Sequence, residues 1–372
     1  MIKKIILLII ILFTSLCTSS CFDFKDINRT VFVTAILVDI DNFNNPILYV
    51  ETFISSRGDV LEVGKETKNI SVSRASSLFD AKRNLTLTSK YTFDYTQCRA
   101  VIFTTKAASF GLDNFLDFFD RGQEIPQRFY VFITPATPDK LLGLKMDEGI
   151  YVGIFLSELA QESRLSSQGT TLRIDEFFNN RYTGSKVNLV NIVDLQKDQV
   201  TPRLSITNLA VLKDDVLVST LTDRETRAYN LLNNTYKFGI IYATNPEHRD
   251  KQTVLDILKS RTKTQLYFDG HNLQLKKKIN EAAIFGYTEK SIKINNPEEK
   301  NFLQEDAENN TKTICQDLFD KYKKKNIDIF NIQREFEMKY PKTKIDNCIQ
   351  ITDLDLEVNI NIKGSTNTTD FK

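Results

Sequence analysis

The sequence contains no tryptophan, and only two histidines and five cysteines among its 372 residues. Histidine titrates near neutral pH and is the commonest metal ligand, so a histidine-based metal centre or a Ser-His-Asp triad would depend on His248 and His271 alone. Both lie in polar, turn-like stretches, "NPEHRD" and "FDGHNL", which are typical of surface positions. We therefore expect no catalytic residue, no bound metal and no cofactor.

An excess of charge is also lacking, because 49 Lys and Arg residues face 48 Asp and Glu residues, for a net charge of +1. Proteins that bind nucleic acid by releasing counterions usually carry a clear basic surplus. The short basic run "KYKKK" at 321–325 is typical of a solvated helix face. The sequence thus predicts no nucleic-acid partner, and its length allows two or three domains.

Long hydrophobic runs are missing as well. The longest, residues 5–13, follows Lys3 and Lys4 and leads into "TSLCTSSC". A basic start, an apolar core of about 7–15 residues and small residues at the end are typical of an export signal. The run is too short to cross a bilayer, which takes roughly 20 apolar residues. We expect residues 1–20 to be a lipoprotein signal peptide and the mature chain to have no membrane-spanning helix.

Cys17 and Cys21 end this segment, and three interpretations compete for them. A metal site needs three or four ligands, and "CTSSC" offers two, with no histidine nearby. A disulfide would close a very small loop inside a segment that export removes. The small residues 18–20 before Cys21 instead resemble a bacterial lipobox, although Thr18 stands where that motif usually has Leu. In that interpretation Cys21 becomes the first mature residue.

Lipidation at Cys21 would give an S-diacylglycerol and N-palmitoyl cysteine, while Cys17 would be discarded with the signal. One acyl chain binds a membrane only marginally, whereas two hold a protein there stably. Cys98, Cys315 and Cys348 would remain as thiols. An exported protein can form disulfides, but three thiols leave one unpaired. A Cys315–Cys348 bridge and three buried free thiols both remain open.

Residues 21–200 alternate between strand and helix patterns, which favours an α/β region with some parallel pairing that could comprise two subdomains. Strand patterns cover 31–40, 47–55, 99–107 and 128–136, and helical patterns cover 71–85, 111–121, 137–144, 150–165 and 172–180. The stretch 193–206 is polar, contains proline and has no helical period. We interpret it as a boundary, after which residues 201–372 form a C-terminal α+β domain.

The second half restarts with two apolar strands around Asp214 and Asp215, a pattern typical of a hairpin. Thr222 and Glu225 then form a capping box, which predicts the start of a helix. A long charged helix over 305–325, a helix ending at Pro341 and an alternating strand over 353–364 complete the chain. The predicted fold class is therefore α/β (α+β) and multi-domain. It has mixed sheets with packed helices, and a strand-rich C-terminal domain with long helices before a final strand.

Four segments resemble, in chain order, the Ger(x)C family of spore germination lipoproteins, the C subunits of nutrient germinant receptors. They are "CFDFKDIN" (21–28), "FLDFFDRGQEIPQRFYVFITPATPDKLL" (115–142), "NLAVLKDDVLVSTLTDRETRAYNLL" (208–232) and "KNIDIFNIQREFEMKYP" (325–341). In the third segment, Leu217, Leu221, Glu225 and Thr226 are in register with the family. The chain departs from the family at Gln97 and Cys98, where a Gly-His pair is usual, and at Phe22, where the family usually has Trp.

The resemblance implies a non-enzymatic receptor subunit that is required for germination and is lipid-anchored on the outer face of the spore inner membrane. Its implied partners are two integral-membrane proteins, an A subunit that resembles a channel and a B subunit that resembles an amino-acid transporter. Glu225 would then cap a helix or, alternatively, contact a partner.

Two other function classes compete with a receptor subunit. An extracytoplasmic solute-binding lipoprotein that captures a small nutrient usually has two similar lobes, whereas the two halves of this chain have different patterns. An acidic hydrolase would need a working carboxylate pair. Glu158 and Glu162 lie four residues apart, but nothing beside them in the sequence indicates a raised pKa.

Overall fold

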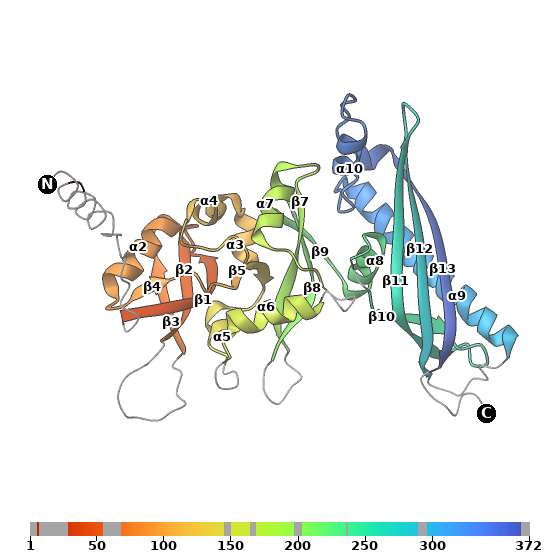
Figure 1. The fold of residues 1–372 in the computed structure, drawn as a ribbon, viewed down its shortest axis with the longest axis horizontal. Coiled ribbons are helices and arrows are strands. Elements are labelled where there is room, and N and C mark those ends of the chain that lie inside the picture. The colour runs from red at the N-terminus through yellow and green to blue at the C-terminus, as the bar shows by residue number, and fades with distance from the viewer. Residues whose placement is uncertain are drawn as a thin grey trace.

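The computed structural model describes Ile6 and residues 29–54, 68–144, 150–163, 169–196, 203–235, 237–288 and 296–365. Within these ranges the chain forms a nine-stranded sheet and a four-stranded sheet, both packed with helices (Figure 1). The predicted fold class is confirmed. The predicted signal peptide at 1–20 and the predicted lipidation site at Cys21 lie outside the described residues, apart from Ile6.

The first sheet has parallel strands at its centre and antiparallel strands at its edges. Its order is β3-β2-β1-β5-β6-β7-β8-β9, and β4 pairs with β1. The strands are β1 (Thr30–Ile40), β2 (Pro46–Ile54), β3 (Lys68–Arg74), β4 (Thr92–Asp94), β5 (Ala100–Thr104), β6 (Tyr130–Thr134), β7 (Val187–Gln196), β8 (Arg203–Lys213) and β9 (Val216–Leu221). The pairs β1–β5, β5–β6 and β6–β7 are parallel, as the strand–helix alternation of the sequence predicts.

Helices cover both faces of this sheet. They are α2 (Leu78–Thr88), α3 (Thr105–Phe110), α4 (Asp113–Arg121), α5 (Pro138–Leu142), α6 (Val152–Ser163) and α7 (Ile174–Tyr182). Along β5, Val101 and Phe103 pack into one core with α2, α3, α4 and α7. Ala100 and Ile102 point to the other face and pack with α5 and α6. A strand that is buried on both faces has apolar residues at consecutive positions, which explains why nearly every residue of β5 is apolar.

The helix predicted over 71–85 is wrong in its first part, which belongs to strand β3. The strand pairs antiparallel with β2 through residue 74, and α2 begins only at Leu78. Ser77 is the N-cap, since its hydroxyl accepts the backbone N–H of Asp80 at 3.1 Å. The serine-rich stretch therefore holds both a strand end and a helix start, which no single periodicity describes.

The polar stretch 193–206 is largely strand. Residues 193–196 of β7 pair with residues 203–206 of β8, and the first sheet continues through β8 and β9. Val193 and Leu204 are buried, whereas Gln196 and Arg203 at the ends of this hairpin are exposed. The predicted division between residues 200 and 201 itself falls outside the described residues and stays a prediction.

The second sheet has the order β10-β11-β12-β13, with β12 and β13 parallel and the other pairs antiparallel. Its strands are β10 (Gly239–Thr244), β11 (Gln252–Phe268), β12 (Leu273–Thr288) and β13 (Thr352–Ser365). The helices around it are α8 (Asp223–Leu232), α9 (Pro297–Lys325) and α10 (Ile332–Lys339), followed by a short 3₁₀ helix, Cys348–Ile351. The alternation predicted for the final strand is confirmed, because Leu356, Val358, Ile360 and Ile362 are all buried.

The long helix α9 lies along this sheet and contacts both edge strands, β10 and β13 (Figure 1). Two of its side chains, four residues apart, reach the backbone of β13. Glu308 accepts the N–H of Ile360 at 2.8 Å, and Gln304 accepts the N–H of Ile362 at 3.3 Å. The helix therefore occupies hydrogen-bonding positions that a further strand would otherwise use.

Candidate functional site

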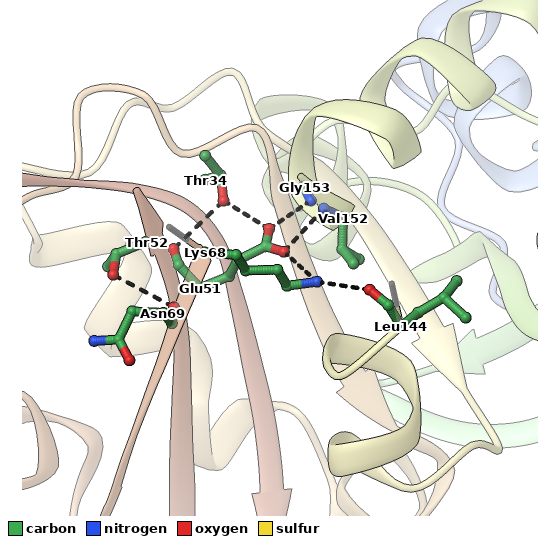
Figure 2. A network of polar contacts seen from close by, with 8 residues as sticks. All are labelled: Thr34, Glu51, Thr52, Lys68, Asn69, Leu144, Val152 and Gly153. Carbon is green, nitrogen blue, oxygen red and sulfur yellow. Dashed lines mark hydrogen bonds and ion pairs between the residues drawn. The ribbon is translucent and has the colours of Figure 1, made fainter. Parts of the chain in front are cut away.

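A fully buried carboxylate, that of Glu51, lies inside the first sheet (Figure 2). The Thr34 hydroxyl on β1 donates to it at 2.6 Å. The backbone N–H groups of Val152 and Gly153 donate at 2.9 and 3.0 Å, and the Lys68 ammonium lies 3.1 Å away. Burying a charge is costly unless the charge is paired and hydrogen-bonded, and here both conditions hold.

Glu51 serves as an anion at the start of α6. The first N–H groups of a helix have no partner within the helix, and the helix dipole favours a negative charge beside them. Lys68 extends the same network, because its ammonium also donates to the carbonyl of Leu144 at 3.2 Å (Figure 2). The network thus joins β1, β2, β3 and α6 through one buried side chain.

Glycine at position 153 is part of this arrangement. A Cβ atom built there would lie 2.0 Å from the backbone oxygen of Thr34, so any side chain would push α6 away from β1. The close approach brings the helix N-terminus within reach of Glu51. Because the Glu51 side chain has no solvent exposure, its role in this arrangement is to hold the fold, not to contact a substrate.

The capping box of the sequence is present in the structure. The Thr222 hydroxyl accepts the N–H of Glu225 at 3.3 Å, and the Glu225 carboxylate accepts the N–H of Thr222 at 2.9 Å. The same carboxylate pairs with Lys321 on α9. Burial raises the pKa of Glu225, but the bonds from Lys321 and Thr222 outweigh it and leave the pKa below its ordinary value. Glu225 is therefore a helix cap that also ties α8 to α9.

The Asp-Ile-Phe segment at 328–330 lies just before α10, which begins at Ile332. The buried Asp328 carboxylate accepts the N–H groups of Phe330 at 3.0 Å and Gln333 at 2.8 Å. Burial raises the pKa of Asp328, and these backbone hydrogen bonds oppose that shift. Ile329 and Phe330 lie in the core of the C-terminal sheet. This family-like segment is thus explained by capping and packing.

The two sheets meet near this segment. The Ser185 hydroxyl donates to the carbonyl of Asp328 at 3.0 Å, and the Lys213 ammonium donates to the carbonyl of Asn326 at 3.2 Å. The predicted hairpin turn before β9 lies at the same place. Asp214 and Asp215 both have positive φ, 48° and 66°, as a type I′ hairpin turn requires.

The other residues singled out in the sequence are not brought together. His271 is exposed and His248 half-buried, each in a turn. Glu158 and Glu162 are both exposed on α6. Among the residues that the structure describes, no group of three or more His, Cys, Asp or Glu side chains could hold a metal ion. No helix in the described ranges is long and apolar enough to cross a membrane.

The three remaining cysteines, Cys98, Cys315 and Cys348, are buried free thiols. The Cys315–Cys348 bridge is therefore absent, and the alternative of free thiols holds. Burial raises the pKa of Cys98 and of Cys348 to about 12, and it also raises the pKa of Cys315. Thiols of this kind stay protonated and unreactive at neutral pH.

Sequence reasoning missed Glu51 and Lys277. Lys277 is only 4% exposed, and its ammonium donates to the Thr264 hydroxyl at 2.9 Å. It belongs to the run "LKKK" but shares its face of β12 with the buried Leu275 and Ile279. For Lys277 the available signal was a charged residue at an inward position of an alternating strand, whereas β2 is buried on both faces and gives no such signal for Glu51.

Comparison with known proteins agrees with the family resemblance. Residues 23–195 match the family model described as "Spore germination protein N-terminal domain", and residues 207–366 match "Spore germination B3/ GerAC like, C-terminal". A search of the curated proteins gives no match. Among solved structures, the fold resembles "Crystal Structure of the GerBC protein" with a TM-score of 0.54 and 14% sequence identity, over 88% of this chain and 96% of that chain. Because the two models match in order and cover most of the sequence, the chain belongs to the GerAC-like family of spore germination proteins.

Proposed function

We propose that this protein is a non-enzymatic, lipid-anchored subunit of a nutrient germinant receptor. Membership of the GerAC-like family is the observation that carries the proposal. Three acids of the structure agree with it, since Glu51, Glu225 and Asp328 are each bonded to backbone N–H groups at the start of a helix. Their chemistry is that of caps and ion pairs.

Anchoring would occur at Cys21. The apolar run, the small residues before the cysteine and its place in the sequence support lipidation there. The N-terminal family model begins at residue 23, two residues after this cysteine. The region that matches the family would then begin just after the lipidated residue. The folded protein would lie on the outer face of the spore inner membrane.

The partners would be the two integral-membrane subunits of the receptor, A and B. In this arrangement the chain acts as an assembly component at the membrane surface, and the germinant is sensed elsewhere in the complex. The predicted division into residues 21–200 and 201–372 would separate two parts of this component. The paired strands β7 and β8 on either side of residue 200 suggest that the two parts fold together.

The test is to replace Cys21 by Ala in spores that depend on this receptor, with Cys17→Ala as the matched control. We expect Cys21→Ala to abolish palmitate incorporation, to release the protein from the membrane fraction and to slow germination. Cys17→Ala should change none of the three. Spores with Cys21→Ala that germinate normally, with the protein still in the membrane at its ordinary level, would show that the lipid anchor is wrong.

A capture role for small nutrients is the competing function. It favours two similar lobes around a cleft, whereas the structure has a nine-stranded and a four-stranded sheet of different order. Isothermal titration of the protein with amino acids and sugars separates the two functions. Saturable micromolar binding of one of these solutes would favour capture over an assembly role.

A further inference from the structure

We propose that the edge of β10 is a docking site for an extended segment of a protein partner, one in which acidic side chains alternate with apolar ones. The site lies between β10, α8 and α9 and does not involve Cys21 or the lipid anchor. It goes beyond the proposed function, because it assigns a surface and a recognition chemistry that family membership does not give.

A groove of about 470 Å³ lies along this edge. Pockets that bind ligands usually measure about 300–1,000 Å³. Apolar side chains from all three elements line it, including Ala228 of α8, Ile240 of β10 and Ile314 of α9. The apolar lining suits the small aliphatic side chains of a bound segment, since burying them removes apolar surface from water.

In the part of the chain that the structure describes, side chains of α9 bond to the outward backbone groups of β10 at Tyr242 and Thr244 but not at Ile240. β10 is an edge strand of its sheet in the described part of the chain. The N–H of Thr244 donates to Asp306 at 2.7 Å, and the carbonyl of Tyr242 accepts from Asn310 at 3.5 Å. These bonds show that the even-numbered residues of β10 direct their backbone groups away from β11.

It follows that the N–H and carbonyl of Ile240 also point away from β11, at the end of the strand opposite to Thr244. The bond from Asn310 is long for a hydrogen bond, so an incoming strand could displace it. An open strand edge is a template for an added strand, in which main-chain hydrogen bonds give affinity and side chains give specificity.

The charge of the groove selects the partner. Its charged lining residues, among those described, are Arg224 and Arg227. Arg227 is held in place by Asp223 at 3.1 Å and stacks over the Tyr242 ring at 5.5 Å, whereas Arg224 is exposed. Guanidinium groups bind carboxylates in bidentate pairs, which favours acidic side chains. Two arginines in a groove are fewer than the four to eight basic residues of a typical lipid-binding cluster.

The proposal can be tested on the full chain in detergent with a fluorescent, end-blocked peptide in which glutamate alternates with valine. Fluorescence anisotropy should show saturable binding. A lysine–valine peptide should bind at least about tenfold more weakly, because the charge-assisted hydrogen bonds are lost. The glutamate–valine peptide with N-methyl groups at alternate backbone nitrogens should lose binding to a similar extent, because the strand pairing is blocked.

Arg224→Glu should weaken binding of the acidic peptide by about tenfold or more. The matched control is Arg83→Glu, an exposed arginine on α2, which should leave binding unchanged. The proposal is overturned if the acidic peptide does not bind at millimolar concentration, if the lysine peptide binds equally well, or if N-methylation has no effect. Complete competition by free glutamate would instead assign the groove to a small carboxylate ligand and would also overturn it.

Discussion

The carboxylate of Glu51 on β2 accepts the backbone N–H of Gly153, in the first turn of α6, at 3.0 Å across 102 residues of sequence (Figure 2). The contact forms because glycine lets the helix approach the backbone of β1 more closely than any other residue would. One buried acid thus fixes the position of a helix that, with α5, packs on one face of the sheet. We expect this network to be a main determinant of the stability of the N-terminal part.

Replacing Glu51 by Gln should destabilise the protein by about 2–4 kcal/mol. The amide keeps the size of the carboxylate but brings two N–H donors into a site whose neighbours are all donors, and it leaves Lys68 without its ion pair. Urea unfolding measures the change, with Glu158→Gln on the exposed face of α6 as the control. A Glu51→Gln variant within about 0.5 kcal/mol of the parent would contradict the assigned role.

Lys277 should make stability depend on pH above neutrality. Burial lowers its pKa from 10.5 to about 8, and the nearby Glu335 and Asp328 oppose this only in part. Between about pH 8 and 10.5 the unfolded chain therefore binds more protons at this residue than the folded chain. The free energy of unfolding should therefore rise with pH across that window, by about 2–4 kcal/mol in total. Below pH 8 Lys277 is charged in both states, and its buried charge destabilises the folded state to the full extent.

Lys277→Met tests this, because it removes the buried charge and keeps an unbranched side chain that is only one atom shorter. The variant should be more stable than the parent at pH 7, and this difference in stability should shrink as the pH rises toward 10.5. The loss of the hydrogen bond to Thr264 should reduce the gain in stability slightly at every pH. Lys276→Met is the control, since Lys276 is exposed and pairs with Asp355 on the solvated face. A difference that does not change with pH would show that Lys277 has an ordinary pKa.

Thr222 and Glu225 should act as one unit. Thr222→Ala should cost about 1 kcal/mol of folding free energy, as the loss of an N-cap usually does. Glu225→Ala removes the reciprocal bond and the ion pair with Lys321 together, so it should cost more. Because the two side chains share one motif, the double variant should lose about 0.5–1 kcal/mol less than the sum of the single variants. Additive losses in chemical denaturation would show that the box is not coupled.

The side chains that cover β13 should protect the sheet from edge-to-edge pairing. Replacing Gln304 and Glu308 by Ala frees the N–H groups of Ile360 and Ile362, which a strand from a second molecule could then bind. We expect the double variant to self-associate at concentrations at which the parent does not, as measured by sedimentation velocity. Asn309 and Lys312 are exposed on α9 and serve as the control pair. Equal sedimentation of all three proteins would indicate that the edge is protected by other means.

The features that were predicted correctly are those whose partners lie close together in the chain. The capping box spans three residue steps, the turn at Asp214 and Asp215 joins adjacent strands, and the final strand carries its alternation in consecutive residues. Such patterns are complete within one segment, so composition and periodicity are sufficient to find them. The family segments were also found because their order survives in the sequence.

The tertiary structure alone decided the rest. The sequence does not show that Glu51 meets α6, that β7 and β8 carry the first sheet past residue 200, or that β10 is an edge strand beside two arginines. Each of these depends on which distant segments pair and in which register, and a single sequence does not determine such pairings by periodicity. By itself the sequence determined most of the local elements and the family, and it predicts an export signal. Long-range packing then decided which charges are buried, which helix ends they cap and where the surface remains open.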